Sequence, residues 1–353
     1  MDKEFFINQP VDNNPVNNQP RFNEQTIDNQ LLLQTMAEQP QWRTDLAIDI
    51  HESLKGSGGP IPGVSETVQE TPVGNVVKLV VQNPEAARRM GKAPGTYVTV
   101  EAPCLGLREK EKQNEVATIL AAEIEKYLQQ VSLDAPVLVV GLGNRQVTPD
   151  SLGPLVAEKI LATRHLKDVV PPELRGKLRP VMSLAPGVLG TTGLETSEIV
   201  KALVKENAPA LVIAIDALAT NSIERLGITI QVADSGINPG SGVGNKRAAL
   251  TYEALGVPVI AIGVPTVVDA ITLVENAVDY MTNRGYDTGR VGQGPIDKPR
   301  IVRDILSRYF GSLFVTPRQI DSLVLDLAQV VAGGLNAALH KGIGPNEINT
   351  YLN

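Results

Sequence analysis

Cysteine, histidine and aromatic residues are scarce in this chain of 353 residues. It has one cysteine, three histidines and an aromatic content of 4%. The single cysteine, Cys104, excludes an internal disulfide, and His51, His165 and His340 do not stand at the spacings that bind zinc. The sequence therefore predicts neither a metal nor another cofactor, and a core built from Val, Ile, Leu and Ala.

Basic blocks and long hydrophobic runs are absent as well. The net charge is −7, without a Lys/Arg-rich stretch, which argues against a nucleic-acid partner. No apolar run approaches the roughly 18 residues of a membrane span. The first residues, Met1 to Asn8, lack the basic-then-apolar order of a signal peptide. We expect a cytoplasmic protein that contacts neither membranes nor nucleic acid directly.

The first 41 residues differ in composition from the rest of the chain. They contain 14 Asn or Gln and few residues that could fill a core, so burial cannot offset the entropy lost on ordering them. This lead is either a disordered tail or a removable, regulatory segment. From Trp42 the composition turns globular. We expect a propeptide-like segment over residues 1–45 and a single α/β domain over residues 46–353.

Short apolar runs alternate with amphipathic segments after the lead. Helices are predicted where apolar residues recur at spacings of three and four, as at Val116, Ile119, Leu120 and Ile124. Strands that alternate with helices indicate an α/β fold, with a mostly parallel sheet and helices on both faces. The predicted strands are 76–81, 96–101, 136–142, 181–184, 210–215, 228–233 and 257–264; the predicted helices are 110–131, 150–164, 197–206, 267–281, 301–309 and 318–339, with loops at 56–63 and 283–299.

Two apolar strands each deliver an acidic residue to their carboxyl ends. Asp150 follows the run that begins at Val137, and Asp216 follows the run that begins at Leu211. Ligands of open α/β sheets bind at the carboxyl ends of strands, so the two carboxylates are a candidate acid/base pair. In the alternative, structural interpretation, Asp150 stabilises the start of a helix and Asp216 binds loop amides.

Other motifs point to functions that the rest of the chain does not support. Gly141-Leu-Gly143 resembles the start of a dinucleotide fingerprint, but Gln146 stands where a third small residue is needed. The triplets that begin at Asp234 and Asp287 match the Asp-Thr/Ser-Gly of pepsin-like proteases. That fold needs two similar all-β lobes, whereas this chain has an α/β pattern, and turns explain both triplets.

Several longer strings resemble one family, the germination proteases (spore proteases) of endospore-forming bacteria. They extend from residue 43 to about residue 270, and the C-terminal helices fit in kind. The strings are Arg43-Thr-Asp-Leu-Ala, Val140-Gly-Leu-Gly-Asn, Val147-Thr-Pro-Asp-Ser-Leu-Gly-Pro154, Ala185-Pro-Gly-Val-Leu-Gly-Thr-Thr-Gly-Leu-Glu-Thr196, Ile215-Asp-Ala-Leu-Ala-Thr, Asp234-Ser-Gly-Ile-Asn-Pro-Gly-Ser-Gly-Val-Gly-Asn and Gly263-Val-Pro-Thr-Val-Val-Asp269.

The resemblance implies an atypical aspartic endopeptidase whose two essential aspartates are Asp150 and Asp216. It also implies a zymogen, small acid-soluble spore proteins as substrates during germination, a homotetramer, and a location in the developing spore core. The family shares its core fold with the hydrogenase maturation proteases, so a peptidase of that kind is an alternative, as is a non-catalytic α/β binding module. We expect Asp150, at a helix start, to be the ionised partner, and Asp216, desolvated by its strand, the protonated one.

The resemblance further predicts self-cleavage between Asp45 and Leu46. Family substrates are cut after an acidic residue that is followed by an apolar residue, Ala, a small residue and Glu. Residues 44–49, Thr-Asp-Leu-Ala-Ile-Asp, repeat that order where the polar lead gives way to globular composition. We expect the bond to be exposed enough to enter the cleft, unless Thr44 and Asp45 merely begin the first structured element.

Overall fold

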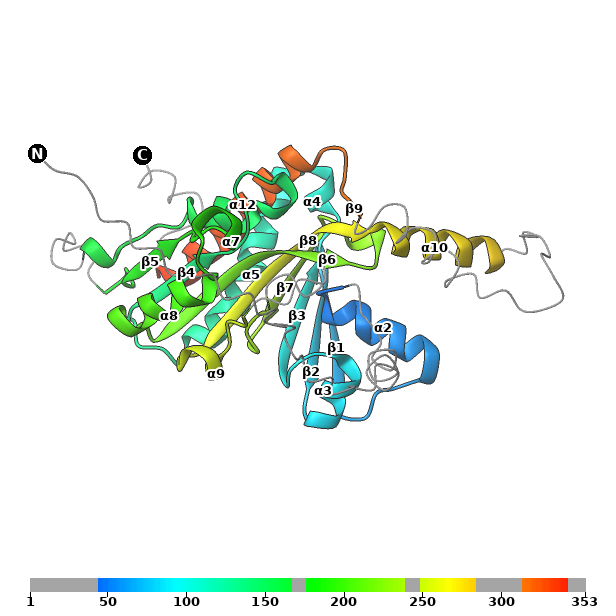
Figure 1. The fold of residues 1–353 in the computed structure, drawn as a ribbon, viewed down its shortest axis with the longest axis horizontal. Helices are drawn as coiled ribbons and strands as arrows, with labels where there is room; N and C mark the ends of the chain where they lie inside the picture. The colour runs from blue at the N-terminus through cyan, green and yellow to red at the C-terminus, as the bar shows by residue number, and fades with distance from the viewer. Residues whose placement is uncertain (1–43, 167–175, 239–247, 284–312, 342–353) are drawn as a thin grey trace, which may run out of the picture. The chain divides into compact units, whose positions relative to one another are not determined.

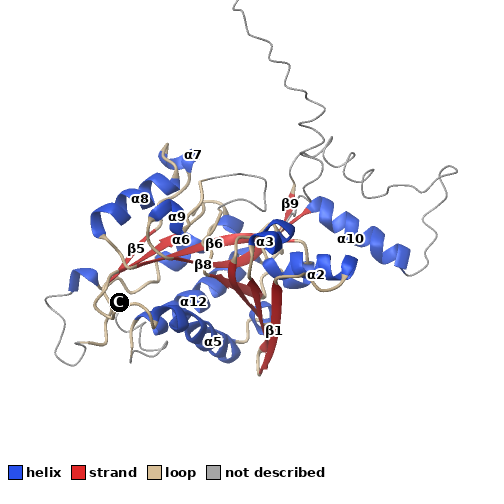
Figure 2. Cartoon of the chain, turned by 90° about the horizontal axis from the view of Figure 1, so that it is seen from below, coloured by secondary structure: helices blue, strands red, loops and turns tan. Residues whose placement is uncertain are grey.

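One mixed sheet organises the domain. The computed structural model describes residues 44–166, 176–238, 248–283 and 313–341. Within these residues the sheet has nine strands, in the order β1-β2-β3-β7-β8-β6-β4-β5, and β9 pairs with β8. Figure 1 and Figure 2 show this sheet with helices packed along it. The fold class is α/β, as the sequence predicts.

The elements have the following bounds. The strands are β1 (Val64–Thr71), β2 (Gly74–Val81), β3 (Gly95–Glu101), β4 (Val137–Gly141), β5 (Val181–Leu184), β6 (Leu211–Thr220), β7 (Thr229–Ala233), β8 (Val259–Asp269) and β9 (Phe314–Val315). The helices are α2 (Ala47–Gly58), α3 (Pro84–Met90), α4 (Cys104–Leu107), α5 (Lys110–Leu128), α6 (Leu152–Ala157), α7 (Leu189–Thr192), α8 (Thr196–Asn207), α9 (Tyr252–Leu255), α10 (Ala270–Asn283) and α12 (Ile320–Leu339), with 3-10 turns η1 (Thr148–Asp150), η2 (Arg164–Leu166) and η4 (Ile223–Arg225).

The sheet consists of a parallel core and an antiparallel extension. Strands β5, β4, β6 and β8 run parallel, which confirms the prediction for strands linked by helices. Strands β7, β3, β2 and β1 continue the sheet in antiparallel pairs. The sequence pattern missed β1 because its residues are mostly exposed and lack the apolar alternation of a half-buried strand.

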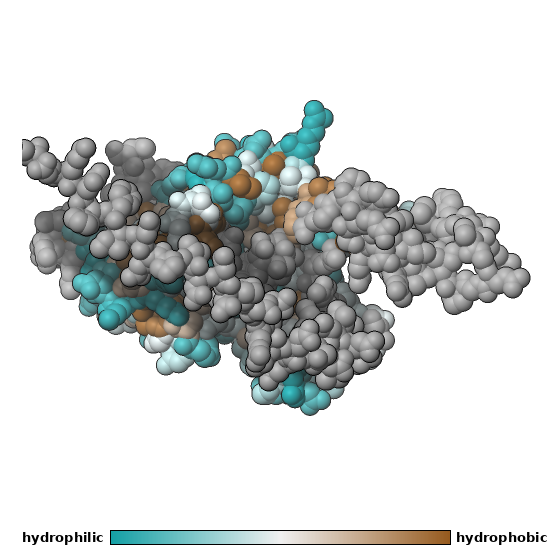
Figure 3. Space-filling model, in the orientation of Figure 1, coloured by the Kyte–Doolittle hydropathy of each residue, from teal (hydrophilic) through white to brown (hydrophobic). Residues whose placement is uncertain are grey.

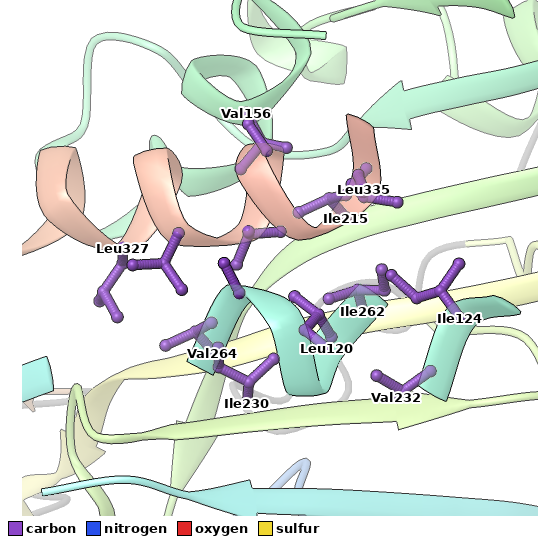
Figure 4. Packing of buried hydrophobic residues seen from close by; sticks show 14 of the residues in the cluster. Leu120, Ile124, Val156, Ile215, Ile230, Val232, Ile262, Val264, Leu327 and Leu335 are labelled. Atoms are coloured by element: carbon purple, nitrogen blue, oxygen red, sulfur yellow. The ribbon is translucent and has the colours of Figure 1, made fainter. Parts of the chain in front are cut away.

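Hydrophobic residues pack on both faces of the sheet. On one face α5, α6 and α12 cover the strands, and Figure 4 shows Leu120, Val156 and Leu335 of these helices with Ile215 and Ile262 of the sheet. On the opposite face, here named the α2/α8 face, α8 and α9 cover the parallel core. Helices α2 and α3 cover the antiparallel extension on that same face. Because successive strand residues point to opposite faces, alternate residues of an inner strand pack against the helices on opposite sides of the sheet.

The helix predicted over residues 150–164 is too long. The observed chain forms η1, then α6, and leaves the helix after Ala157. The side chain of Asn336 on α12 accepts a hydrogen bond from the Leu161 amide at 2.9 Å and donates one to the Lys159 carbonyl at 2.9 Å. These bonds satisfy backbone groups that a longer helix would pair internally. A distant side chain therefore sets this boundary, and local sequence does not reveal it.

One prediction about glycines also needs correction. Helix α2 extends to Gly58, so the first part of the loop predicted over 56–63 is helical. Helix α12 runs unbroken through Gly333 and Gly334. A Cβ on Gly334 would lie 2.9 Å from the Ala117 carbonyl of α5, so glycine there permits close helix packing rather than a break. The predicted helix 301–309 lies outside the described residues, as does nearly all of the predicted loop 283–299.

Helix α12 has the length and composition of a membrane span. It is the single helix of that kind in the described part of the chain, and 67% of its 18-residue hydrophobic stretch is buried inside the domain. Its apolar residues belong to the same core cluster as those of α5 and the sheet. A buried core helix accounts for these properties, because hydrophobic residues all round a helix are typical of a domain interior.

His340, which follows α12, makes the stability of the fold pH-dependent. It is fully buried, with its Nε2 atom 3.1 Å from the Leu161 carbonyl oxygen. Desolvation is the main reason that its pKa is lowered to about 4, although the bond to Leu161 acts in the opposite direction. Folding therefore requires the neutral imidazole. Above the unfolded pKa of roughly 6.5 both states are neutral, and below it only the unfolded state binds the proton.

We predict that His340 alone removes about 2–3 kcal/mol of unfolding free energy between pH 7 and pH 4.5. Urea denaturation at the two pH values measures the loss in the natural protein and in His340→Gln, which cannot titrate. The pH dependence should be smaller in the variant by about that amount. His165→Gln, at an exposed position of η2, is the matched control and should keep the natural pH dependence. An unchanged dependence in His340→Gln would contradict the prediction.

Candidate active site

Asp216 lies within β6 rather than in a loop after it. The strand continues to Thr220 and pairs with β8 throughout, so the expectation that Asp216 ends its strand is wrong. Strand β4, on the other side, pairs with β6 only as far as Ile215. Asp216 is therefore the first β6 residue beyond the β4 ladder. It is 5% exposed, points to the α2/α8 face, and accepts a hydrogen bond from the Ala217 amide at 2.9 Å.

Asp150 is the last residue of η1 and is half-buried. Its carboxylate accepts a hydrogen bond from the Asn144 amide at 2.7 Å. The turn that precedes it needs glycine at position 143, where φ is +109° and a Cβ would lie 2.1 Å from the Asp150 carbonyl oxygen. The glycines that suggested a nucleotide fingerprint thus serve a different purpose: Gly143 lets the turn fold back onto Asp150.

Backbone packing brings both aspartates to the carboxyl edge of the parallel core. The Leu142 amide donates to the Ile215 carbonyl at 2.7 Å, so the end of β4 lies beside the residue before Asp216. A Cβ on Gly153 would lie 2.2 Å from the Leu142 carbonyl oxygen and 2.6 Å from the Ile215 carbonyl oxygen. Turn η1 comes within 8 Å of β6 and of β8, Cα to Cα. The turn that carries Asp150 therefore lies near the strand that carries Asp216, and the action of the two carboxylates as a pair stays a prediction.

A row of residues crosses the α2/α8 face at the level of Asp216. In the register of the sheet, Asp216 pairs with Gly263 of β8, and Gly263 pairs with Gln231 of β7. A pocket on this face is lined by Gly263, Gln231, Leu218 and Lys92, among others. The side chain of Leu218 occupies the space over Gly263, where a Cβ would lie 2.4 Å from it. Sequence reasoning missed Gln231 and Lys92, since neither belongs to a motif: the sheet register brings Gln231 here, and Lys92 follows α3.

The predicted self-cleavage site lies on the α2/α8 face as well. The Asp45 amide donates to the Ala219 carbonyl at 2.8 Å, and the Ala219 amide donates to the Asp45 carboxylate at 2.9 Å. Leu46 is fully buried. The expectation that this bond is exposed is wrong for the described fold, because residues 44–46 pack onto β6 instead of extending into solvent. Cleavage of the bond itself stays a prediction.

A buried carboxylate fixes the segment that follows Asp45. Asp49 is 1% exposed and accepts hydrogen bonds from the hydroxyls of Thr44 at 2.6 Å and Thr220 at 2.7 Å. It also pairs with Arg225 at 2.9 Å. A buried charge is tolerated only when it is paired and hydrogen-bonded. The network therefore ties the start of α2 to the end of β6 and fixes the position of Asp45 between them.

Lys92 holds the carbonyl group of Asp45. Its Nζ atom donates to the Asp45 carbonyl oxygen at 2.7 Å, and the Gln231 side-chain amide approaches the same oxygen at 3.4 Å. Burial lowers the pKa of Lys92, against the raising effect of the carboxylates of Asp45 and Asp49. Among the described residues, the half-buried Lys92 provides the cationic group that contacts this carbonyl oxygen.

The described fold differs from that of a pepsin-like protease. Asp234 follows β7, and its carboxylate accepts a hydrogen bond from the Thr96 amide at 2.7 Å, at the start of β3. This is the structural turn that the sequence predicts as the alternative. The second triplet, at Asp287, lies outside the described residues. The single mixed sheet also differs from two all-β lobes.

Metal and thiol chemistry find little support in the described residues. No group of three or more His, Cys, Asp or Glu side chains within these residues could hold a metal ion. The expectation of a cofactor-free enzyme stays a prediction. Cys104 is buried, and burial raises the pKa of its thiol, which disfavours the thiolate that nucleophilic catalysis needs.

The described domain has an α/β fold with a parallel core, and Asp150 and Asp216 come from segments at the end of β4 and within β6. The sequence profile of the germination proteases matches residues 46–294 and 283–352. The chain belongs to the germination protease family and is an endopeptidase of the aspartic type.

The chain matches several curated germination proteases over nearly the whole length of those proteins. The chain is 42% identical to a germination protease of Caldanaerobacter subterraneus subsp. tengcongensis, over 88% of this chain and 98% of that protein. It is 38% identical to one of Bacillus cereus, over 88% and 96%, and 37% identical to one of Halalkalibacterium halodurans, over 89% and 98%. Among solved structures, the [NiFe] hydrogenase maturation protease HycI of Thermococcus kodakarensis KOD1 is similar at 20% identity and a TM-score of 0.31, over 60% of this chain and 97% of that one.

Proposed function

We propose that this endopeptidase degrades small acid-soluble spore proteins when spores germinate, with Asp150 and Asp216 as its catalytic pair. The observation that carries the proposal is the position of Asp216 just beyond the β4 ladder, with the turn that carries Asp150 close to β6, in a member of the germination protease family. The pocket beside Gly263 gives a peptide a place to lie near the strand that carries Asp216. The spore proteins follow from the family resemblance.

The proposed mechanism uses one proton shared by two carboxylates, since like charges close together disfavour ionisation of both. The ionised partner, assigned to Asp150, takes a proton from the attacking water. The protonated partner, assigned to Asp216, donates to the scissile carbonyl or to the leaving amide. Two features support the assignment: Asp150 is half-buried and accepts the Asn144 amide, whereas Asp216 is almost completely buried in an apolar strand.

We further propose that the enzyme is made as a zymogen and cuts itself between Asp45 and Leu46. The segment lies on the α2/α8 face, the face to which Asp216 points. Removal of residues 1–45 would free the part of β6 that Asp45 now occupies. An extended substrate could then pair with Ala219 in the same way, because exposed strand edges and backbone groups are common peptide-binding sites.

A homotetramer in the spore core completes the proposal. It follows from the family resemblance. Several large apolar side chains are exposed on the described surface and are available for subunit contacts. They include Leu107, Leu189, Leu194 and Tyr252, and Figure 3 shows hydrophobic residues among hydrophilic ones on one face.

Asp150→Asn and Asp216→Asn should each lower kcat on a purified small acid-soluble spore protein by at least about 10⁴-fold, the order of loss seen when one member of a catalytic unit is removed. An amide can neither take a proton from water nor supply one. Gel-based cleavage assays measure the loss, and circular dichroism checks the fold. Asp234→Asn is the matched control and should keep most of the activity. Near-normal turnover by a folded variant of either residue would refute the pair.

Self-cleavage should produce a new N-terminus at Leu46 when the full-length protein is held at mildly acidic pH. Acid favours the reaction because the pair must hold one shared proton, which is lost as the pH rises. Intact-mass spectrometry over time measures the cut, with Asp150→Asn as the inactive control. A full-length chain that stays stable, or a new terminus well away from Leu46, would contradict the proposal.

A further inference from the structure

The carbonyl group of the Asp45–Leu46 bond is held by two side-chain donors that belong to no motif. The ammonium of Lys92 donates to its oxygen at 2.7 Å, and the amide of Gln231 approaches it at 3.4 Å. The same Gln231 side chain accepts a hydrogen bond from the Ala47 amide at 2.7 Å. Gln231 therefore spans the bond, with one contact on each side of it.

The donors lie on the same face and at the same level of the sheet as Asp216. Gln231 pairs with Gly263, and Gly263 pairs with Asp216. Adjacent strands are spaced by roughly 4.8 Å, so Gln231 and Asp216 stand about 10 Å apart. The side chain of Leu218 lies over Gly263 between them, and the pocket beside it is lined by Asp45, Lys92 and Gly263. The Asp45 carbonyl group thus has its donors on the β7 side, and the strand that carries Asp216 is the second strand from β7 in the sheet.

We propose that Lys92, assisted by Gln231, is a catalytic residue that stabilises the negative charge on the Asp45 carbonyl oxygen during self-cleavage. The inference rests on the proposed cut between Asp45 and Leu46. Side-chain donors aimed at an oxygen where charge develops are among the largest sources of rate enhancement in acyl transfer. A cation in a partly buried site interacts more strongly with that charge than it would in water.

The reaction balances with these groups. Water oxygen bonds to the Asp45 carbonyl carbon, and its proton passes to the ionised carboxylate of the pair. The electron pair of the C=O bond moves onto the oxygen beside Lys92. When the tetrahedral species collapses, the bond to the Leu46 nitrogen breaks and that nitrogen takes a proton from the pair. The products are a carboxylate at Asp45 and an amine at Leu46, with no redox change.

The segment has anchors other than Lys92. Asp45 is bonded to Ala219 through two hydrogen bonds, and Thr44 is bonded to the buried carboxylate of Asp49. Within the described residues, the hydrogen bond of the Lys92 ammonium goes to the Asp45 carbonyl oxygen. Removal of the Lys92 ammonium should therefore leave the Asp45–Leu46 peptide bond in place. The negative charge that develops on the Asp45 carbonyl oxygen would then lack a cation beside it. This separation makes a catalytic role distinguishable from a structural one.

The test is the first-order rate of self-cleavage of the full chain, followed by intact mass at mildly acidic pH, in Lys92→Met. The expected slowing is about 10²–10³-fold, as when an oxyanion donor is removed. Lys92→Arg should recover part of the rate because it keeps a cation. Lys55→Met is the matched control: Lys55 is an exposed lysine of α2 whose ammonium pairs with Glu66 at 2.8 Å, and its loss should leave the rate unchanged.

Hydrogen–deuterium exchange over residues 44–50 and 211–220 reports whether the segment stays seated. Slow cleavage with natural protection supports the proposal. Cleavage by Lys92→Met within threefold of the natural rate overturns it, as does slow cleavage with lost protection, which would make Lys92 an anchor. If Lys92→Met does not fold, Lys92→Gln replaces it, with about tenfold slowing expected. A natural protein that never cuts at Leu46 refutes the proposed self-cleavage and this inference together; cutting at the natural rate by every Lys92 variant refutes the inference alone.

Discussion

The site depends on one close backbone contact, that of the start of α6 with the ends of β4 and β6. Gly153 lies against the backbones of Leu142 and Ile215, at separations that leave no room for a Cβ. Because protein interiors are close-packed, such a contact permits little adjustment. It fixes η1 at the carboxyl edge of the parallel core, and with it Asp150. The geometry proposed for catalysis is thus set by main-chain packing, and the carboxylates are carried on a rigid frame.

The same edge of the sheet receives the segment that the enzyme is proposed to cut. Asp45 pairs with Ala219 on β6, and the buried Asp49 carboxylate holds the start of α2 against Arg225. Residues 44–46 therefore lie at the strand that carries Asp216. Under the proposed function, the uncut segment and a substrate would use the same surface. At position 263 a glycine leaves room for the Leu218 side chain beside that strand.

Apolar periodicity predicted β2 to β8 and the helices α5, α8 and α12, because burial imposes the pattern it reads. It missed α2 and α3, which also contribute to the core. It also identified Asp150 and Asp216 as acidic residues delivered by neighbouring strands. It could not predict β1, whose residues are exposed, or the end of α6, which depends on Asn336 from the far end of the chain. Gln231 escaped notice because the sheet register brings it to the site, and Lys92 because it follows a helix that the pattern missed.

The central claim is that Asp150 and Asp216 act together on one water molecule. A crystal structure of the mature enzyme with a peptide that carries a statine residue tests it most directly, because the statine hydroxyl mimics the tetrahedral species. The account predicts that this hydroxyl lies within about 3 Å of a carboxylate oxygen of each aspartate. A hydroxyl bound to only one of them, or at Asp234 instead, would contradict it.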